Sequence, residues 1–103
     1  MEEFIADIRA ELEQEQATDV YTTLAKVVGN ILRNPCEAKF RTLRKDNKLV
    51  AQNICTSMAA VSLLLLLGFE DLEEAYHCPT TTDLEQMRAA SELLQNMTLD
   101  LEL

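Results

Sequence analysis

Several residue types are scarce in this 103-residue chain, which has no tryptophan, two glycines, two prolines and one histidine. So few glycines and prolines are typical of a folded helical protein, and 48% hydrophobic residues are too many for a disordered acidic tail. Gly29 and Gly68 stand far apart, which excludes a glycine-rich phosphate-binding loop. We therefore predict one mostly helical domain over residues 1–103.

The scarcity of histidine and cysteine limits the chemistry that the chain can perform. His77 is the only histidine, so a metal site or a catalytic triad would lack partners. Cys36, Cys55 and Cys78 are widely spaced and include no Cys-x-x-Cys pair. We predict no enzyme activity, no cofactor and no metal site. The odd number of thiols and the missing secretory signal predict reduced cysteines in the cytoplasm or nucleus.

The longest apolar run covers residues 58–67 and carries no charge. It is half the length of the roughly 20 residues that a bilayer span needs, so we expect no membrane insertion. Thr56 or Ser57 can cap this run, which predicts a helix in the centre of the bundle because it is apolar on every side. Gly68 should end the helix in a left-handed conformation, with Phe69 folded back on the helix end.

Hydrophobic spacing predicts the helices on the N-terminal side of that run. Apolar positions 4, 5, 8 and 12 indicate a first helix to about Gln14. A second helix should begin with a cap at Thr18 or Asp19 and end before Pro35. Asn34 with Glu37 forms a capping box that predicts a third helix over residues 35–44. A turn or helix restart follows at residues 46–47.

The C-terminal part of the chain should end in a helix. Thr82 and Glu85 form a capping box, and the apolar positions behind it predict an inner helix face. That face consists of Leu84, Met87, Ala90, Leu94 and Met97. Between residues 70 and 82 the periodicity breaks down, which favours a loop, with a short strand or hairpin as the alternative around residues 75–78.

Positive charge is also scarce, because nine Lys and Arg residues stand against eighteen Asp and Glu residues, for a net charge of −9. Six of the nine fall within sixteen positions. They are Arg33, Lys39, Arg41, Arg44, Lys45 and Lys48. A solvated helix face with weak ion pairs would explain this basic cluster without any function. Nucleic-acid binding is a further alternative, which a sequence pI near 4.4 and the lack of interleaved aromatic side chains disfavour.

Geometry favours a peptide ligand for the basic cluster. In the predicted third helix and the turn after it, Phe40, Arg44 and Asn47 stand at i, i+4 and i+7, which places a ring, a guanidinium and an amide on one face. That combination suits a peptide with a carboxylate and an apolar anchor. A purely architectural domain that packs on its own parent chain through the long apolar helix remains the other alternative.

The same residues resemble a known family. The motif Asn30-Ile-Leu-Arg-Asn34-Pro35-x-x-x-Lys39-Phe40-Arg41-x-x-Arg44-x-x-Asn47, followed by Gly68-Phe69-Glu70, resembles the PUB domain. The resemblance is specific from about residue 20 to residue 70. It implies a mainly α fold, a compact helical bundle with a small antiparallel sheet or hairpin near the C-terminal side. Short strands would then lie in the segment after Gly68.

The resemblance also implies a partner. PUB domains bind the C-terminal tail of the AAA ATPase valosin-containing protein, a segment rich in acids that ends in an aromatic residue. The implied function is a non-enzymatic adaptor that links a parent protein to ubiquitin-proteasome or ER-associated degradation. The implied peptide pocket consists of Asn30, Lys39, Phe40, Arg44, Asn47, Gly68 and Phe69. We expect a monomer that binds neither nucleic acid nor membrane.

Each residue of this implied pocket has an expected role. Arg44 and Lys39 would be the working cations, with Arg44 on an acid or carboxylate. Asn30 and Asn47 would hydrogen-bond the peptide backbone, while Phe40 and Phe69 would flank the aromatic side chain. Many family members have tyrosine where this chain has Phe40, so a hydroxyl hydrogen bond is lost here. The other four cations of the cluster would only shape the local field.

Two of the implied pocket residues also have structural explanations. Phe69 could pack only as a staple on the helix end, and Asn30 could cap the break before Pro35.

Overall fold

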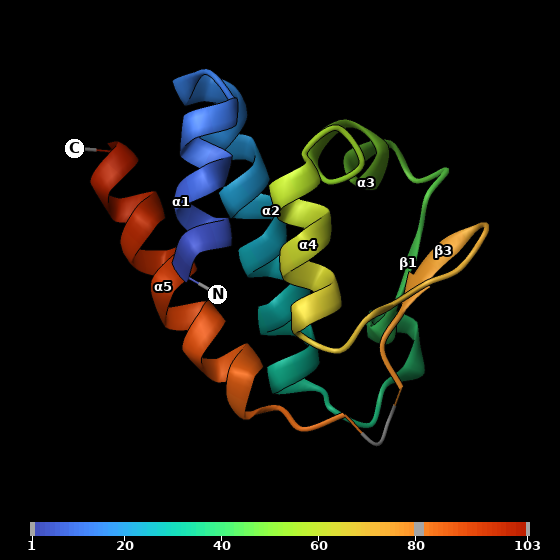
Figure 1. Ribbon diagram of the computed structural model, residues 1–103. Helices are drawn as coiled ribbons and strands as arrows, with labels where there is room; N and C mark the ends of the chain where they lie inside the picture. The colour runs from blue at the N-terminus through green and yellow to red at the C-terminus, as the bar shows by residue number, and fades with distance from the viewer. Residues whose placement is uncertain (1, 80–81, 103) are drawn as a thin grey trace.

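The computed structural model describes residues 2–79 and 82–102, with side chains to residue 96. Within these residues, five α-helices form a bundle, and three short strands form a sheet at one side of it (Figure 1). The helices are α1 (Glu2–Glu11), α2 (Gln14–Arg33), α3 (Lys48–Asn53), α4 (Met58–Leu66) and α5 (Glu85–Glu102). The strands are β1 (Thr42–Arg44), β2 (Glu70–Asp71) and β3 (Ala75–His77), and a 3-10 helix, η1 (Ala38–Arg41), precedes β1. The predicted fold class is confirmed.

Helix α2 is the long central element and packs against α5, α3 and α1. One side of it is buried, with the spacings of three and four that the sequence predicted. The buried residues are Ala17, Val20, Tyr21, Leu24, Val28 and Ile31. The helix begins at Gln14, four residues before the predicted cap, and Thr18 lies inside it, where its hydroxyl donates back to the Gln14 carbonyl at 2.8 Å instead of capping the helix. Tyr21 donates its hydroxyl to the Ile5 carbonyl and so joins α2 to α1.

Helix α4 has both of its predicted ends. Ser57 caps the N-terminus, since its Oγ accepts a hydrogen bond from the Ala60 N–H at 3.2 Å. At the other end Gly68 has a φ of +108°, and the Phe69 N–H donates to the Leu64 carbonyl while the Gly68 N–H donates to that of Leu65. These two bonds form a Schellman motif. Its local signals are strong enough to set the boundaries of this helix.

The predicted position of α4 at the bundle centre is wrong. One side is buried, but Met58, Leu65 and Leu66 are exposed by 80%, 45% and 40%. Figure 1 shows α4 beside α1 and in front of α2, with its outer side uncovered. Because an all-apolar sequence has no amphipathic pattern, it cannot indicate which side faces solvent.

The predicted third helix over residues 35–44 is also wrong. Asn34 is the C-cap of α2 rather than the start of a new helix, and the chain then forms η1 and the strand β1. Two long-range interactions oppose the helix. The buried Arg41 side chain donates to the Pro79 carbonyl, and Thr42 pairs with His77 across the sheet. Phe40, Arg44 and Asn47 therefore do not share a helix face.

The sheet has the strand order β1-β3-β2, and both pairings are antiparallel. In register, His77 of β3 lies between Thr42 of β1 and Glu70 of β2. The strands implied by the family resemblance are thus confirmed. The alternative of a short strand around residues 75–78 is confirmed as well. The buried Tyr76 on β3 packs the sheet on the helical core.

Helix α5 begins later than the predicted capping box indicates. Its first residue is Glu85, and the Asp83 carboxylate, not Thr82, accepts from the Glu85 N–H at 3.0 Å. The predicted inner face is confirmed for Met87, Ala90 and Leu94, which are fully buried. The side chain of Met97, predicted for the same face, lies outside the described residues.

Candidate functional site

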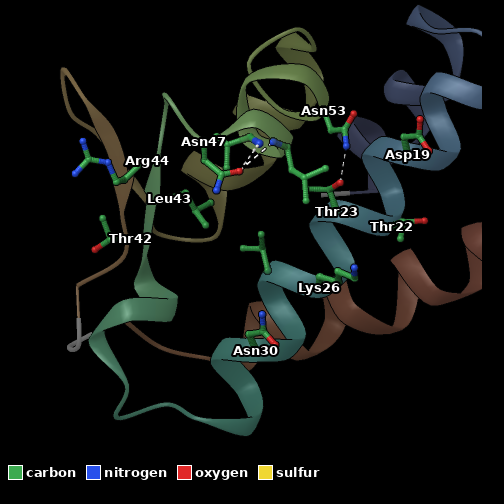
Figure 2. Close-up of a pocket in the computed structure, with 13 residues that line it drawn as sticks. Asp19, Thr22, Thr23, Lys26, Asn30, Thr42, Leu43, Arg44, Asn47 and Asn53 are labelled. Atoms are coloured by element: carbon green, nitrogen blue, oxygen red, sulfur yellow. Dashed lines mark hydrogen bonds between the residues drawn. The ribbon is translucent and has the colours of Figure 1, made fainter.

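A groove of about 540 Å³ lies between α2, β1 and α3. Figure 2 shows it open between the α2 side chains and the strand-and-helix segment opposite. Its α2 wall consists of Asp19, Thr22, Thr23, Lys26, Val27 and Asn30. The opposite wall consists of Thr42, Leu43, Arg44, Asn47, Leu49, Val50 and Asn53. The groove thus has an apolar floor and polar or charged side chains around it.

The α2 wall follows from helical periodicity. Asp19, Thr23, Lys26 and Asn30 stand at i, i+4, i+7 and i+11, so they form one polar stripe beside the buried side of the helix. Val27 lies in the same region, half-buried against the core. At one end the groove is closed by a hydrogen bond from Asn53 Nδ2 to Thr23 Oγ1 at 2.9 Å, which Figure 2 shows as a dashed line.

The β1 wall follows from strand alternation. Leu43 is half-buried and points toward α2, whereas Thr42 and Arg44 project from the other side of the strand (Figure 2). Leu43 therefore supplies apolar surface to the groove. Arg44 stands at the rim of the groove, and its side chain extends away from α2 into water (Figure 2).

Arg44 has an internal partner. Its Nε and Nη2 donate to the two carboxylate oxygens of Asp46 at 3.1 and 3.2 Å, which forms a bidentate ion pair. This hydrogen bonding lowers the pKa of Asp46 and raises that of Arg44. Because both side chains are well exposed, the pair is weak and can be exchanged for another carboxylate.

Asn47 caps the helix beside the groove. Its Oδ1 accepts from the N–H groups of Leu49 and Val50 at 3.0 and 3.3 Å, which starts α3. The carbonyl oxygen of this amide is therefore occupied. Among the described residues the Nδ2 group has no partner, so it is the atom of Asn47 that can donate to a ligand.

Asn30 lies at the end of the groove nearest the C-terminus of α2 (Figure 2). Its Oδ1 accepts from Arg33 Nη2 at 2.9 Å, and its backbone carbonyl accepts from the Asn34 N–H at 3.0 Å. The Asn30 side chain does not cap the break before Pro35. Asn30, Arg44 and Asn47 thus converge on one groove from three different elements.

The other four predicted site residues lie outside this groove. Lys39 and Phe40 belong to η1, and the Lys39 ammonium stands over the Phe40 ring at 5.1 Å from its centroid. Gly68 and Phe69 precede β2, and Phe69 is 3% exposed within the core. Phe69 is therefore a structural staple of α4 in this structure, and Phe40 is half-buried against the core.

The remaining cations of the basic cluster differ from one another. Arg41 was expected to shape the local field, but it is 2% exposed and hydrogen-bonds backbone carbonyls on two segments. Lys45 donates to Asp71 and stands over the Tyr76 ring at 4.7 Å. Lys48 has no ion pair among the described residues, and Arg33 bonds Asn30. The cluster is thus partly structural.

The sequence matches the PUB domain family over residues 14–92, which is most of the chain. This chain is a PUB domain. It is 34% identical over 71 residues to the peptide-N(4)-(N-acetyl-beta-glucosaminyl)asparagine amidase of Gallus gallus, and 32% identical over the same length to that of Homo sapiens. The match covers 69% of this chain and 11% of each relative. PUB domains are protein-interaction modules, so the groove is a candidate protein-binding site.

Sequence reasoning missed several residues of this PUB domain groove. Lys26, Thr23 and Asn53 line it, although none was predicted. A signal for two of them was present, because the polar stripe on α2 continues from Asn30 back to Lys26 and Thr23 at helical spacing. Asn53 is contributed by α3, whose position beside α2 depends on the tertiary fold.

Within the described residues, this PUB domain shows no cluster of three or more His, Cys, Asp or Glu side chains that could hold a metal ion. His77 instead pairs its Nδ1 with Thr42 Oγ1 at 3.0 Å across the sheet, which is a structural contact. None of the helices in the described part of the chain is long and apolar enough to cross a membrane.

Proposed function

We propose that this PUB domain binds the acidic, aromatic-ended C-terminal peptide of the AAA ATPase valosin-containing protein. The observation that carries the proposal is the groove between α2, β1 and α3, which combines an apolar floor with two cations on its rim. Such a site on a chain of net charge −9 favours an anionic peptide with one apolar anchor.

The groove offers a place for each part of such a peptide. An aromatic side chain would pack against Val27, Leu43 and Val50. The acids before it would meet Lys26 and Arg44, with Arg44 exchanging Asp46 for a carboxylate of the ligand. Peptide carbonyls would accept from the side-chain amides of Asn30 and Asn47.

The four family residues outside the groove have supporting roles in this proposal. Lys39 adds positive charge near the start of β1, and Phe40 packs η1 against the core. Gly68 and Phe69 fix the chain where β2 begins, at the same end of the sheet as the start of β1. A tyrosine hydroxyl at position 40 is therefore not needed to shape the groove itself.

The proposed role in the cell is that of an adaptor. The domain would tether a parent protein to the ATPase, with no chemistry of its own, and so connect that protein to ubiquitin-proteasome or ER-associated degradation. The proposal includes a cytoplasmic or nuclear location and a monomeric domain.

Calorimetric titration with a synthetic tail peptide tests the proposal. We expect a dissociation constant in the micromolar range, about −8 kcal/mol at 1 μM. Arg44→Ala and Lys26→Ala should each weaken binding by about tenfold, because each removes a cation from the rim. Arg88→Ala removes the same charge from the exposed part of α5 and should change binding by less than about twofold.

Several results would overturn this assignment. The first is no measurable heat with the tail peptide, and the second is equal binding by the wild-type and Arg44→Ala domains. Replacement of the terminal aromatic residue of the peptide by alanine should abolish detectable binding, since the anchor would be lost. A single-stranded oligonucleotide that displaced the peptide would assign the groove to nucleic acid instead.

A further inference from the structure

The outer side of α4 is an uncovered apolar surface. With about 3.6 residues per turn, its nine residues divide into two sides. The inner side holds Ala59, Ala60, Leu63 and Leu64, which are buried. The outer side, called the α4 face below, holds Met58, Val61, Ser62, Leu65 and Leu66. The helix has no charged residue, so the α4 face is apolar except for one hydroxyl.

Acidic side chains run along one edge of the α4 face. Ser57 Oγ donates to Glu11 Oε2 at 3.0 Å, so the C-terminal end of α1 meets the N-terminal end of α4. The two helices therefore lie antiparallel side by side, as Figure 1 shows. Glu3, Asp7 and Glu11 stand at i, i+4 and i+8 on α1, and all three are exposed.

Acidic residues also lie just beyond the C-terminal end of α4. After the Schellman motif the chain continues into the exposed residues Glu70 and Asp71 of β2, of which Asp71 is paired with Lys45. The basic residue of α1, Arg9, lies on the opposite side of that helix from Glu11, since two residues span about 200°. The charged side chains beside the α4 face are therefore mostly acidic, in contrast to the two cations at the groove.

We propose that the α4 face binds a basic amphipathic helix of another protein. Leucine-type side chains of such a helix would cover Met58, Leu65 and Leu66, and its lysines or arginines would face the acids of α1. Because the acids lie along one edge of the α4 face, they would orient the partner helix, while the apolar contact would supply most of the affinity. The α4 face is short, about 13 Å long, so two to three turns of a partner would fill it.

The acidic edge of the α4 face disfavours the other occupants that an apolar face invites. A second copy of this chain would bring the same acidic edge against itself, which is unfavourable. An anionic membrane surface would be repelled for the same reason. Within the described part of this chain, α1, α2 and α5 already bury their apolar sides in the bundle, so none is free to cover α4.

The α4 face is separate from the groove. None of the groove residues belongs to α1 or α4. A peptide in the groove and a helix on the α4 face would thus bind at the same time. The domain would then hold two partners rather than one.

Fluorescence anisotropy with a labelled model peptide tests this inference. The probe is a helix of about 14 residues with leucines on one side and lysines on the other, and a leucine–glutamate peptide of the same pattern is its control. We expect the lysine probe to bind and the glutamate probe not to bind. The Met58→Gln/Leu65→Gln variant should weaken binding by about tenfold, because it removes apolar contact.

Matched control variants distinguish binding at the α4 face from nonspecific hydrophobic binding. Leu72→Gln replaces a leucine of similar exposure, 47%, in the turn between β2 and β3 and should change binding by less than about twofold. Glu3→Gln/Asp7→Asn should weaken binding and reduce its salt dependence, whereas Glu85→Gln/Glu92→Gln on α5 should have a smaller effect. Arg44→Ala should leave binding of the lysine probe unchanged, although the same variant should weaken binding of the tail peptide in the groove.

Five outcomes would overturn the inference. The first three are no binding of the lysine probe, equal binding of the glutamate probe, and equal binding by the Met58→Gln/Leu65→Gln and Leu72→Gln variants. The fourth is a wild-type dimer in sedimentation that Leu65→Gln dissociates, which would assign the α4 face to a second copy. Binding of the domain to anionic vesicles would likewise contradict it.

Discussion

The Arg41 guanidinium donates from Nη1 to the carbonyl oxygen of Pro79 at 2.8 Å, across 38 positions of the chain. Its Nε and Nη2 also donate to the Pro35 carbonyl at 3.0 and 2.8 Å. Among the described residues no carboxylate pairs with this cation. Arg41 thus holds the segment after α2 against the segment that leads to α5, mainly through backbone oxygens and with one further contact from Nη1 to Cys78 Sγ at 3.5 Å.

Replacement of Arg41 should destabilise the domain strongly. Arg41→Met would leave two backbone carbonyls without their charged donor, which should lower the free energy of unfolding by about 2–4 kcal/mol. Arg41→Lys should recover little of this loss, because an ammonium cannot reproduce the planar fork. Urea denaturation measures the free energy of unfolding of both variants. Lys39→Met, at the exposed position two residues earlier, should stay within about 0.5 kcal/mol of wild type. An Arg41→Lys domain of full stability would refute the forked role.

The Ser57 N-cap should stabilise the domain more than an ordinary N-cap does. Its hydroxyl accepts from Ala60 N–H and donates to Glu11, and the residue is fully buried. Ser57→Ala should therefore lower the free energy of unfolding by about 2 kcal/mol, at the upper end for N-caps. Thermal denaturation followed by circular dichroism measures the change. Thr56→Ala, on the exposed neighbour that was the other candidate cap, should cost less than about 0.5 kcal/mol.

The two glycines should respond to alanine with opposite sign. Gly68 has a φ of +108°, and a Cβ there would lie 2.5 Å from Thr82 Cγ2, so Gly68→Ala should destabilise the domain by at least about 1–2 kcal/mol. Gly29 lies within α2, where a Cβ would meet only the flexible Arg33 side chain at 3.4 Å. Gly29→Ala should stabilise the domain by about 0.5–1 kcal/mol. Equal effects of the two changes in urea denaturation would contradict the left-handed role of Gly68.

The Arg44–Asp46 pair should be visible in the titration of Asp46. Hydrogen bonding to Arg44 lowers the pKa of this carboxyl below its ordinary value of 3.8. Because this pKa is lower in the folded state, the ionised Asp46 stabilises the fold above pH 3.8. That contribution to the free energy of unfolding is lost as the pH falls through the folded-state pKa. Carboxyl-carbon NMR should show the pKa of Asp46 returning toward 3.8 in Arg44→Ala.

The same pair gives a test that involves the ligand. Under the proposed function Asp46→Asn should strengthen tail-peptide binding several-fold, because Arg44 would no longer have to exchange an internal carboxylate. Calorimetry at neutral pH measures this. Weaker binding by Asp46→Asn would mean that Asp46 orients Arg44 for the ligand rather than competing with it.

Some features of the fold could be predicted because their signals are local. Ser57, Gly68 and Phe69 set the ends of α4 through contacts within a few residues, and the predicted boundaries are confirmed. Residues 35–44 show the opposite case. Their capping box is a real local signal, but the strand pairing of Thr42 with His77 and the burial of Arg41 depend on residues 35 or more positions away. Tertiary interactions therefore override the local preference.

The site was predictable to a similar extent. The family motif identified Asn30, Arg44 and Asn47, which the fold brings to one groove. The helical geometry that was first used to group Arg44 and Asn47 with Phe40 is wrong, because Arg44 lies in a strand and Asn47 caps α3. Lys26 could have been found from its helical spacing to Asn30, whereas Asn53 joins the groove through the packing of α3 on α2, which no sequence spacing expresses.

The strand order β1-β3-β2 has a consequence for how the groove forms. β1, which supplies one groove wall, pairs with β3 alone, and that partner comes more than 30 positions later in the chain. The helical wall depends on a pair almost as distant, since Asn53 of α3 bonds Thr23 of α2, 30 positions earlier in the chain. Both walls should therefore form only after long loops have closed, and closing long loops slows folding. The domain becomes able to hold a ligand in one of the last steps of its folding.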